Sequence, residues 1–247
     1  RIHGYPEHYV HRHDIHPWEW IASTGREVGV LPSGAGTIAM ELDAHFFSPK
    51  GFRSLVNALP EWKLVDCFEL VNWVRAVKSE AEIQYMRTAA RVTTAAMQAA
   101  IDTIGVGVPQ NMVAAQIARA QAEGDGEAWG DFPAIVPMLP TGTSADTPHL
   151  TWSDRVLTEG DAVVVELAGA HRRYHVPLAR TVMLGEPSDD LLRLEDAVAE
   201  GLQVVLDTAA RPPRRGPLHE RPPCPRRGAD RHLHLPPPRT GRDLGLA

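Results

Sequence analysis

The sequence is poor in cysteine and has no long apolar run. Its two cysteines, Cys67 and Cys224, lie far apart and in different surroundings, so neither a disulfide framework nor a zinc cluster is predicted. No stretch approaches the roughly 18 apolar residues that span a bilayer, and the first residues carry histidines and charges where a signal peptide would be apolar. We therefore expect a cytoplasmic protein without a membrane partner.

An initiator methionine is also absent, since the sequence begins at Arg1. This predicts that the amino-terminal part of a longer chain is missing and that the fold is incomplete at its start. The 247 residues, of which 43% are hydrophobic, can bury a substantial core. Length alone allows either one large domain or two small ones.

The last part of the chain, residues 211–247, cannot build a core. It lacks Val, Ile, Phe, Tyr, Trp, Met, Lys, Ser, Asn and Gln, but holds nine of the 21 prolines, nine arginines and three acidic residues. One interpretation is an arm that binds RNA or proline-recognition domains, although interleaved aromatics and a repeated PxxP register are missing. We favour a frameshift in a GC-rich gene, because its out-of-frame codons yield mostly Pro, Arg, Gly, Ala, Leu and His. We expect a disordered segment without function.

The formal charge changes sign at the same place. Residues 211–247 carry +6 and the whole chain carries −6, so residues 1–210 carry −12. An acidic body argues against nucleic acid as a partner.

Before that break, the chain reads as alternating helices and strands. Residues 1–76 hold short apolar runs between turn residues, namely TIAMEL, FRSLV and KLVDC. This pattern is typical of the end of an α/β domain. A capping box of Ser79 and Glu82 then predicts a long amphipathic helix that ends at Gly105. A second helix should run from Pro109 to Gly124.

The following segment predicts an antiparallel sheet and a last helix. Its short β-branched runs are separated by Gly, Pro and charged turns: AIVPML, DAVVVELAG and PLARTVMLG. Ser188 should cap the last helix, whose apolar stripe continues to Ala210.

Two residues of this segment could carry chemistry. Glu166 stands in the middle of an apolar predicted strand, where it forms either a structural ion pair, for example with Arg180, or a nucleophile or base with a tuned pKa. His149 lies in the loop before that strand; a lone histidine is more often a surface residue than a catalytic one. Together, a carboxylate and an imidazole supply a nucleophile and a proton donor, which suffice to hydrolyse an activated carbon–nitrogen bond.

Two further clusters have structural explanations beside functional ones. Tyr174 and His175 sit in a predicted turn and Arg180 on the return strand, where they either bind a ligand or only shape a hairpin. The histidines near the start suggest a metal site, but they lack zincin spacing and a helical context, so we expect none there: His3, His8, His11, His13 and His16.

Several longer runs resemble the creatinase and aminopeptidase P superfamily, which has the pita-bread fold. LVNWVRAVKSEAEIQYMRTAARV looks like the hinge and first helix of its catalytic domain. The runs that resemble ectoine hydrolases within it are HGYPEHYV, FPAIVPMLPTGTSADTPHLTWSDRVLTEGD and VVVELAGAHRRYHVPLARTVMLGEP. The resemblance covers residues 1–210. It implies an α/β (α+β) fold with the end of a creatinase-like domain at 1–76 and the first half of a pita-bread domain at 77–210, before the frameshifted segment 211–247.

The resemblance also bears on metals. Metal-dependent relatives carry two ligating aspartates at positions that here hold Glu166 and Pro177. Proline has no ligating side chain, so the usual two-metal site cannot be assembled in its usual form, and we expect no metal and no cofactor. His149 matches the catalytic histidine of metal-free creatinase, whereas Ala179 replaces a glutamate that creatinase carries, which argues against creatine as the substrate.

The resemblance therefore implies a homodimeric hydrolase that opens the cyclic amidine ring of ectoine, with hydroxyectoine as a second candidate substrate. Glu166 and His149 would be catalytic, and Tyr174, His175 and Arg180 would bind the substrate. Two alternatives remain: a metal-dependent Xaa-Pro peptidase, which Pro177 argues against, and an inactive fragment. The second half of the pita-bread domain should follow residue 210 and is not recognisable in the sequence.

Overall fold

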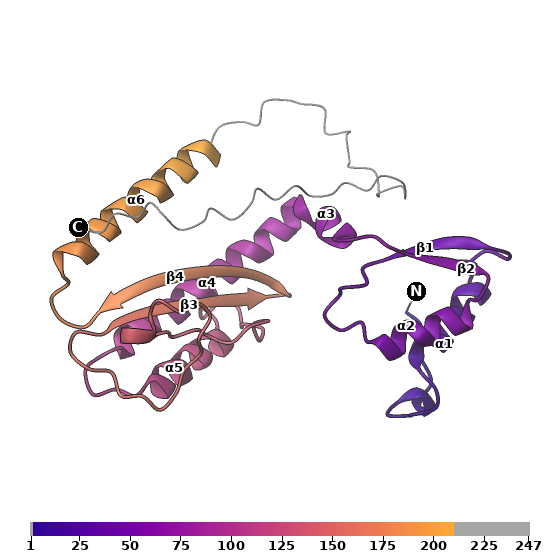
Figure 1. The fold of residues 1–247 in the computed structure, drawn as a ribbon, viewed down its shortest axis with the longest axis horizontal. Helices are drawn as coiled ribbons and strands as arrows, with labels where there is room; N and C mark the ends of the chain where they lie inside the picture. The colour runs from indigo at the N-terminus through magenta and orange to yellow at the C-terminus, as the bar shows by residue number, and fades with distance from the viewer. Residues whose placement is uncertain (1, 210–247) are drawn as a thin grey trace, which may run out of the picture. The chain divides into compact units, whose positions relative to one another are not determined.

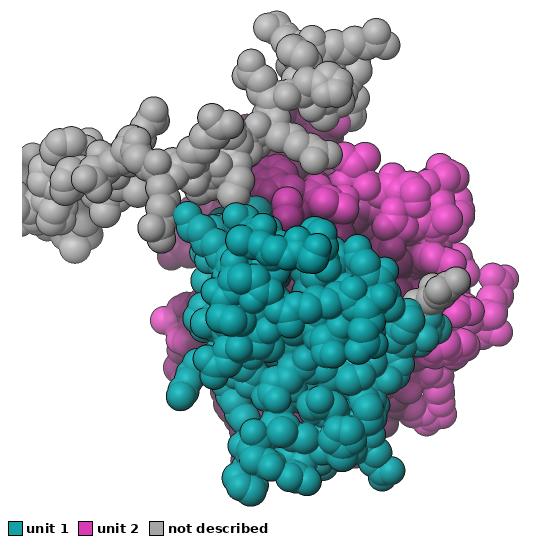
Figure 2. All heavy atoms as spheres, turned by 90° about the vertical axis from the view of Figure 1, so that its right-hand side faces the viewer, with its two compact units in different colours: residues 1–68, 212–247 teal, residues 69–211 magenta. Residues whose placement is uncertain are grey.

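The computed structural model describes residues 2–209, which fall into two compact units, residues 2–68 and 69–209 (Figure 2). Along the chain, the division between the two units falls between Phe68 and Glu69, whereas the predicted domain boundary lies after residue 76. Residues 61–104 contain neither glycine nor proline, so the sequence offered no signal for the earlier position. The segment expected to be disordered, 211–247, lies outside the described residues.

The amino-terminal unit is a small α/β unit (Figure 1). After a 3-10 turn η1 (Glu7–Tyr9) and helix α1 (Pro17–Glu27), strand β1 (Gly36–Met40) leads through helix α2 (Pro49–Ala58) to strand β2 (Trp62–Asp66). The two strands pair in parallel, which requires a crossover connection such as α2. These elements have the α/β character predicted for this part of the chain, and its assignment as the end of a larger domain stays a prediction.

The core of this unit lies between the helices and the two strands. Its fully buried members are Ala22, Leu55 and Leu59. Gly36 pairs with Trp62, and a Cβ at Gly36 would overlap the Trp62 ring, so the indole requires glycine there.

The carboxy-terminal unit contains the remaining elements. They are α3 (Leu70–Ala76), α4 (Glu80–Thr103), α5 (Gln110–Glu123), a 3-10 turn η2 (Gly142–Ser144), strands β3 (Ala162–His171) and β4 (Tyr174–Met183), and α6 (Asp189–Ala209). The predicted capping box is present: Ser79 Oγ accepts from the Glu82 N–H, and the Glu82 carboxylate accepts from the Ser79 N–H. The two predicted helices are confirmed as α4 and α5.

Strands β3 and β4 form an antiparallel hairpin that packs against α4 (Figure 1). Alternate β3 side chains face the core: Val163, Val165 and Leu167 are buried with residues of α4 and α5. Val164 and Glu166 therefore point to the other face of the hairpin. A carboxylate can occupy this apolar strand because it faces away from the core.

Strand β3 is hydrogen-bonded along both edges. On the edge away from β4 it forms isolated bridges with Asp131, Met138 and Thr141. The prediction of a strand at AIVPML was therefore wrong, since only Met138 of that run pairs. Pro133, Pro137 and Pro140 interrupt the segment, and prolines cannot donate to a ladder.

The approach of α4 to the hairpin is close at one point. A Cβ on Gly169 would overlap the backbone N of Thr93 and lie 2.8 Å from the Ala89 carbonyl oxygen. Thr93 Oγ1 accepts from the Gly169 N–H at 2.9 Å and donates to the Val176 carbonyl at 2.7 Å. One threonine thus links α4 to both strands.

Helix α6 follows β4 and begins at the predicted cap, where Ser188 Oγ accepts from the Leu191 N–H. None of its residues is buried among the described part of the chain. Its apolar stripe is instead exposed, with 63% of Val198 and 58% of Leu202 accessible to solvent. Within residues 2–209, no helix is both long and apolar enough to cross a bilayer.

Candidate active site

A cavity of about 400 Å³ lies over the face of β3 that points away from the core. Val164 and Glu166 of β3 form one wall, and the bridged segment beside β3 adds Met138 and Pro140. The loop that follows η2 supplies the remaining lining residues: Ala145, Asp146, Pro148 and His149. The two candidate catalytic residues thus line one cavity, although 17 positions separate them in the sequence.

Glu166 is half-buried in this wall. Its backbone exchanges two hydrogen bonds with Met138, at 3.1 Å and 2.9 Å. Within residues 2–209, its carboxylate has no hydrogen bond and no salt bridge. The structural ion pair with Arg180 is not formed: Arg180 opposes Val165, is exposed, and donates to the Ala179 carbonyl. The carboxylate therefore remains available to a ligand in the cavity.

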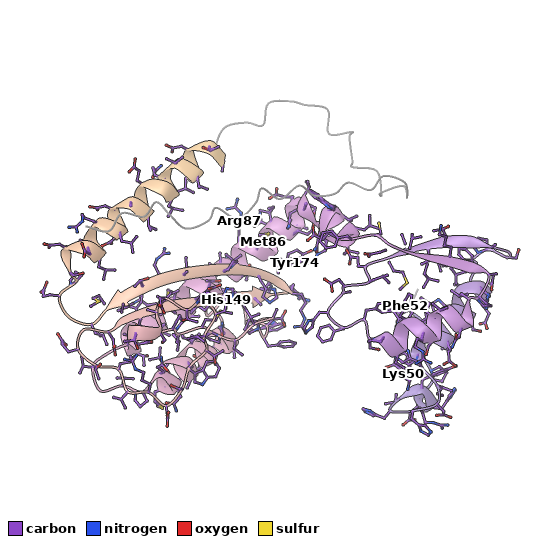
Figure 3. The ribbon with its side chains drawn as sticks, viewed as in Figure 1. Lys50, Phe52, Met86, Arg87, His149 and Tyr174 are labelled. Carbon is purple, nitrogen blue, oxygen red and sulfur yellow. The ribbon has the colours of Figure 1, made fainter. Side chains whose placement is uncertain are left out.

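His149 lies on an exposed part of the loop (Figure 3). Its backbone has a positive φ of 63°, a conformation that few residues other than glycine adopt and in which histidine is moderately enriched. The loop closes through a hydrogen bond from the Leu139 N–H to the Leu150 carbonyl at 3.0 Å. The backbone at His149 thus requires a loop that is held in place.

A charged cluster supports the base of the same loop. Arg155 donates to Asp161 at 2.7 Å, and Asp161 also accepts from the N–H and the hydroxyl of Thr158. Burial acts to raise the pKa of Asp161, but these hydrogen bonds and the Arg155 charge outweigh it and hold the pKa below its ordinary value. Gly142, with φ 59°, lies against this pair, and a Cβ there would overlap Asp161.

The three predicted substrate-binding residues do not line the cavity. The Tyr174 hydroxyl donates to Glu82 at 2.8 Å and its ring lies on Tyr85, beside the start of α4 (Figure 3). His175 accepts from the Ala134 N–H at 2.9 Å. Arg180 is exposed on β4. The described contacts of Tyr174 and His175 hold the hairpin end in place, and a role of these residues in binding a substrate stays a prediction.

Asp146 was missed in the sequence. It lines the cavity three positions before His149, and its only signal was an acidic residue in the same polar loop as a candidate histidine. Such residues are common on solvated surfaces, so the sequence could not distinguish it. Its charge adds to that of Glu166 and makes the cavity suitable for a cation.

Comparison with known proteins bears on this site. The sequence pattern of metallopeptidase family M24 matches residues 84–217. The chain belongs to metallopeptidase family M24.

The relatives of this M24 chain have different names. It is 40% identical over 213 residues to the ectoine hydrolase of Halomonas elongata, covering 83% of this chain and 52% of that protein. It is 27% identical over 151 residues to the Xaa-Pro dipeptidase of Pyrococcus horikoshii, covering 61% and 41%. The chain therefore spans about half the length of these curated relatives.

The fold comparison agrees with the family. The X-Pro aminopeptidase of Thermotoga maritima superposes with a TM-score of 0.61 at 23% identity, covering 74% of this chain and 48% of that one. The α/β (α+β) fold of the pita-bread superfamily, predicted from the resemblance, is confirmed.

Membership in M24 implies metal ions, and the described residues do not fit a metal pair. The resemblance noted in the sequence implies that Glu166 and Pro177 occupy the positions of two ligating aspartates in metal-dependent relatives. Ala168 opposes Pro177 and Glu166 opposes Ala179, so both positions lie on one face of the hairpin, yet only Glu166 offers an oxygen ligand. Within residues 2–209, no group of three or more His, Cys, Asp or Glu could hold a metal ion. Among the clustered histidines near the start, His16 instead caps α1.

Proposed function

We propose that this chain is part of a hydrolase that opens the cyclic amidine ring of ectoine to N-acetyl-2,4-diaminobutyrate, without a metal ion and as a homodimer. The observation that carries the proposal is that Glu166 and His149 line the same cavity. Pro177, which has no ligating atom on the face shared with Glu166, supports a mechanism without a metal pair. The 40% identity to an ectoine hydrolase supports the choice of substrate.

The chemistry follows from the two side chains. Protonated ectoine has an electrophilic carbon between two nitrogens. The Glu166 carboxylate attacks this carbon, or accepts a proton from a water molecule that attacks it. His149 delivers a proton to the ring nitrogen that leaves, so that the carbon–nitrogen bond breaks and the nitrogen departs as an amine. The oxygen of one water molecule ends in the new acetyl group, which balances the hydrolysis.

The lining of the cavity suits such a substrate. Glu166 and Asp146 bring negative charge to a cationic amidinium, and Met138, Pro140, Pro148 and Val164 offer apolar contacts. Its volume of about 400 Å³ lies at the lower end of the range of small-molecule sites. Hydroxyectoine differs from ectoine by one hydroxyl group, so we expect it to be accepted as well.

Ring opening tests the proposal directly. The purified chain is incubated with ectoine, and N-acetyl-2,4-diaminobutyrate is quantified by NMR. We expect product from the wild type and none from Glu166→Gln, because the amide is neither a nucleophile nor a base. Glu186→Gln is the matched control, since Glu186 is exposed and outside the cavity, and it should retain full activity.

The same assay separates the alternatives. An Xaa-Pro dipeptide, supplied with and without a divalent metal ion, should not be cleaved. Metal-dependent cleavage of the dipeptide, or wild-type protein that leaves ectoine intact, contradicts the proposal. Retained activity in Glu166→Gln contradicts the assigned role of Glu166.

A further inference from the structure

We propose that Gln110 is a positioning residue that holds the loop of residues 141–153, and through it His149, over Glu166; this assignment rests on the proposed function. Gln110 is the first residue of α5 and does not line the cavity. Its side chain acts through the loop that carries His149 and Asp146.

The Gln110 amide is buried, with 5% of the residue exposed. A buried amide needs a full set of hydrogen bonds, because each unsatisfied polar group is costly. Nε2 donates to the Leu139 carbonyl at 2.9 Å and to Thr141 Oγ1 at 2.8 Å. Oε1 accepts from the Ser153 N–H at 3.0 Å and from its hydroxyl at 2.9 Å. The amide thereby binds the beginning and the end of the loop at once.

The backbone at the start of α5 reinforces this attachment. Pro109 occupies the N-cap position and makes no side-chain cap, so the first N–H groups of the helix need other acceptors. The Gln110 N–H donates to the Arg155 carbonyl at 2.9 Å, and the Asn111 N–H to the Ser153 carbonyl at 3.0 Å. The carbonyls of Ser153 and Arg155, at the end of the loop, thus cap the helix. The Gln110 side chain also binds Leu139 and Thr141, at the start of the loop.

His149 depends on this arrangement because it lies between the two anchor points. Its positive φ is maintained only if the surrounding loop is fixed. A displacement of about 1 Å between reacting groups can lower a rate by about 100-fold. A loop held at one end only would therefore lose catalytic geometry before the unit unfolds.

A purely structural role is the alternative, and the chain offers a matched control. Gln121 lies on the same helix, is 3% exposed, and donates to the Ala168 carbonyl at 2.9 Å. It contacts β3 and not the loop. Gln110→Met and Gln121→Met each keep the length and volume of the side chain while removing its hydrogen bonds, so both should lower the melting temperature.

Amide hydrogen exchange followed by mass spectrometry measures how firmly the loop of residues 141–153 is held. We expect Gln110→Met to speed exchange in peptides covering 141–153 by about 10-fold or more, and Gln121→Met to leave those peptides unchanged. The NMR signal of the His149 ring should shift or broaden only in Gln110→Met. Unchanged exchange and an unchanged His149 signal in Gln110→Met overturn the proposal.

Kinetics then connect the loop to the reaction. At a temperature where both variants are folded, Gln110→Met should lower kcat by about 10- to 100-fold with a smaller change in KM, while Gln121→Met keeps the wild-type kcat. Gln110→Glu keeps the acceptor for Ser153, and its kcat should lie between those of Gln110→Met and Gln121→Met. Wild-type protein that opens no ring refutes the proposed function alone, because exchange and the His149 signal still decide whether Gln110 holds the loop. Normal kcat in Gln110→Met refutes the positioning role.

Discussion

At the scale of single residues, the backbone of His149 restricts which side chains its position tolerates. Its φ of 63° disfavours residues with a Cβ, except for Asn, Asp and His. Alanine would remove the imidazole and also strain the backbone, which confounds two effects. Asparagine keeps the backbone preference and removes the proton donor.

His149→Asn should therefore fold normally and open ectoine about 100- to 10,000-fold more slowly, which is the usual contribution of a positioned acid or base. Circular dichroism checks the fold and product formation gives the rate. His45→Asn is the control, since His45 is exposed and lies in the other unit. An active His149→Asn would remove His149 from the mechanism.

Glu166 could be singled out from the sequence as a candidate because an acidic residue in an apolar strand is rare. The alternation of side chains along β3 explains why its side chain points away from the core. The hydrogen bond from Tyr174 to Glu82 joins residues 92 positions apart, and local sequence carries no information about such a contact. The same holds for Gln110, which no pattern distinguished from the other polar residues of its helix. Long-range partners decide these roles.

At the scale of the element, the start of α4 is joined to the hairpin by one carboxylate. Glu82 accepts from the Ser79 N–H and hydroxyl, both at 2.7 Å, and from Tyr174. These hydrogen bonds, that from the Ser79 backbone first, lower its pKa from 4.5 to about 2. Because they favour the charged form, they stabilise the fold only while the carboxylate is ionised.

We expect the carboxy-terminal unit to lose this stabilisation as the pH falls from 4.5 to about 2. A carboxylate whose pKa is lower in the folded state stabilises the fold fully above its unfolded-state pKa. It no longer does so below its folded-state pKa. Urea unfolding at a series of pH values measures the free energy of unfolding. Glu82→Gln should flatten its pH dependence in this range. Glu80→Gln, in the same helical turn but bonded to Gln84, should not. Equal slopes in both variants would contradict the assignment.

The elements with local signals were predicted well. α4 has a capping box, α5 lies between Pro109 and Gly124, and both helices have regular apolar spacing. The hairpin strands have β-branched runs, so the bounds of these elements follow within a few residues. The segment beside β3 was misjudged because its pairing depends on three isolated bridges with β3 and not on its own composition. Tertiary pairing overrode local preference there.

At the scale of the whole molecule, the apolar stripe of α6 is exposed along the helix. Its members are Leu194, Val198, Leu202 and Val205, each 58–63% accessible. Contiguous apolar surface of this kind promotes association. The described part of the chain supplies nothing that buries it.

We expect the purified chain to self-associate with rising concentration. The double variant of Val198→Lys and Leu202→Lys should weaken association by about 10-fold or more for each residue, because burial of such a side chain stabilises by about 1.5–3 kcal/mol. Light scattering measures the mass. Ala199→Lys with Gln203→Lys adds the same charge beside the stripe and should have little effect. A wild-type chain that stays monomeric throughout would contradict this prediction.

The bridged edge of β3 has a consequence for how the protein is made. The cavity is lined by residues 138–166, and Gln110 precedes them all. On a ribosome, amino-terminal segments emerge and fold first, so every residue that lines the cavity emerges from the exit tunnel before β4 and α6 do. The helices and the loop that surround the cavity thus precede Glu166 in the order of synthesis, and β4 completes the hairpin after it.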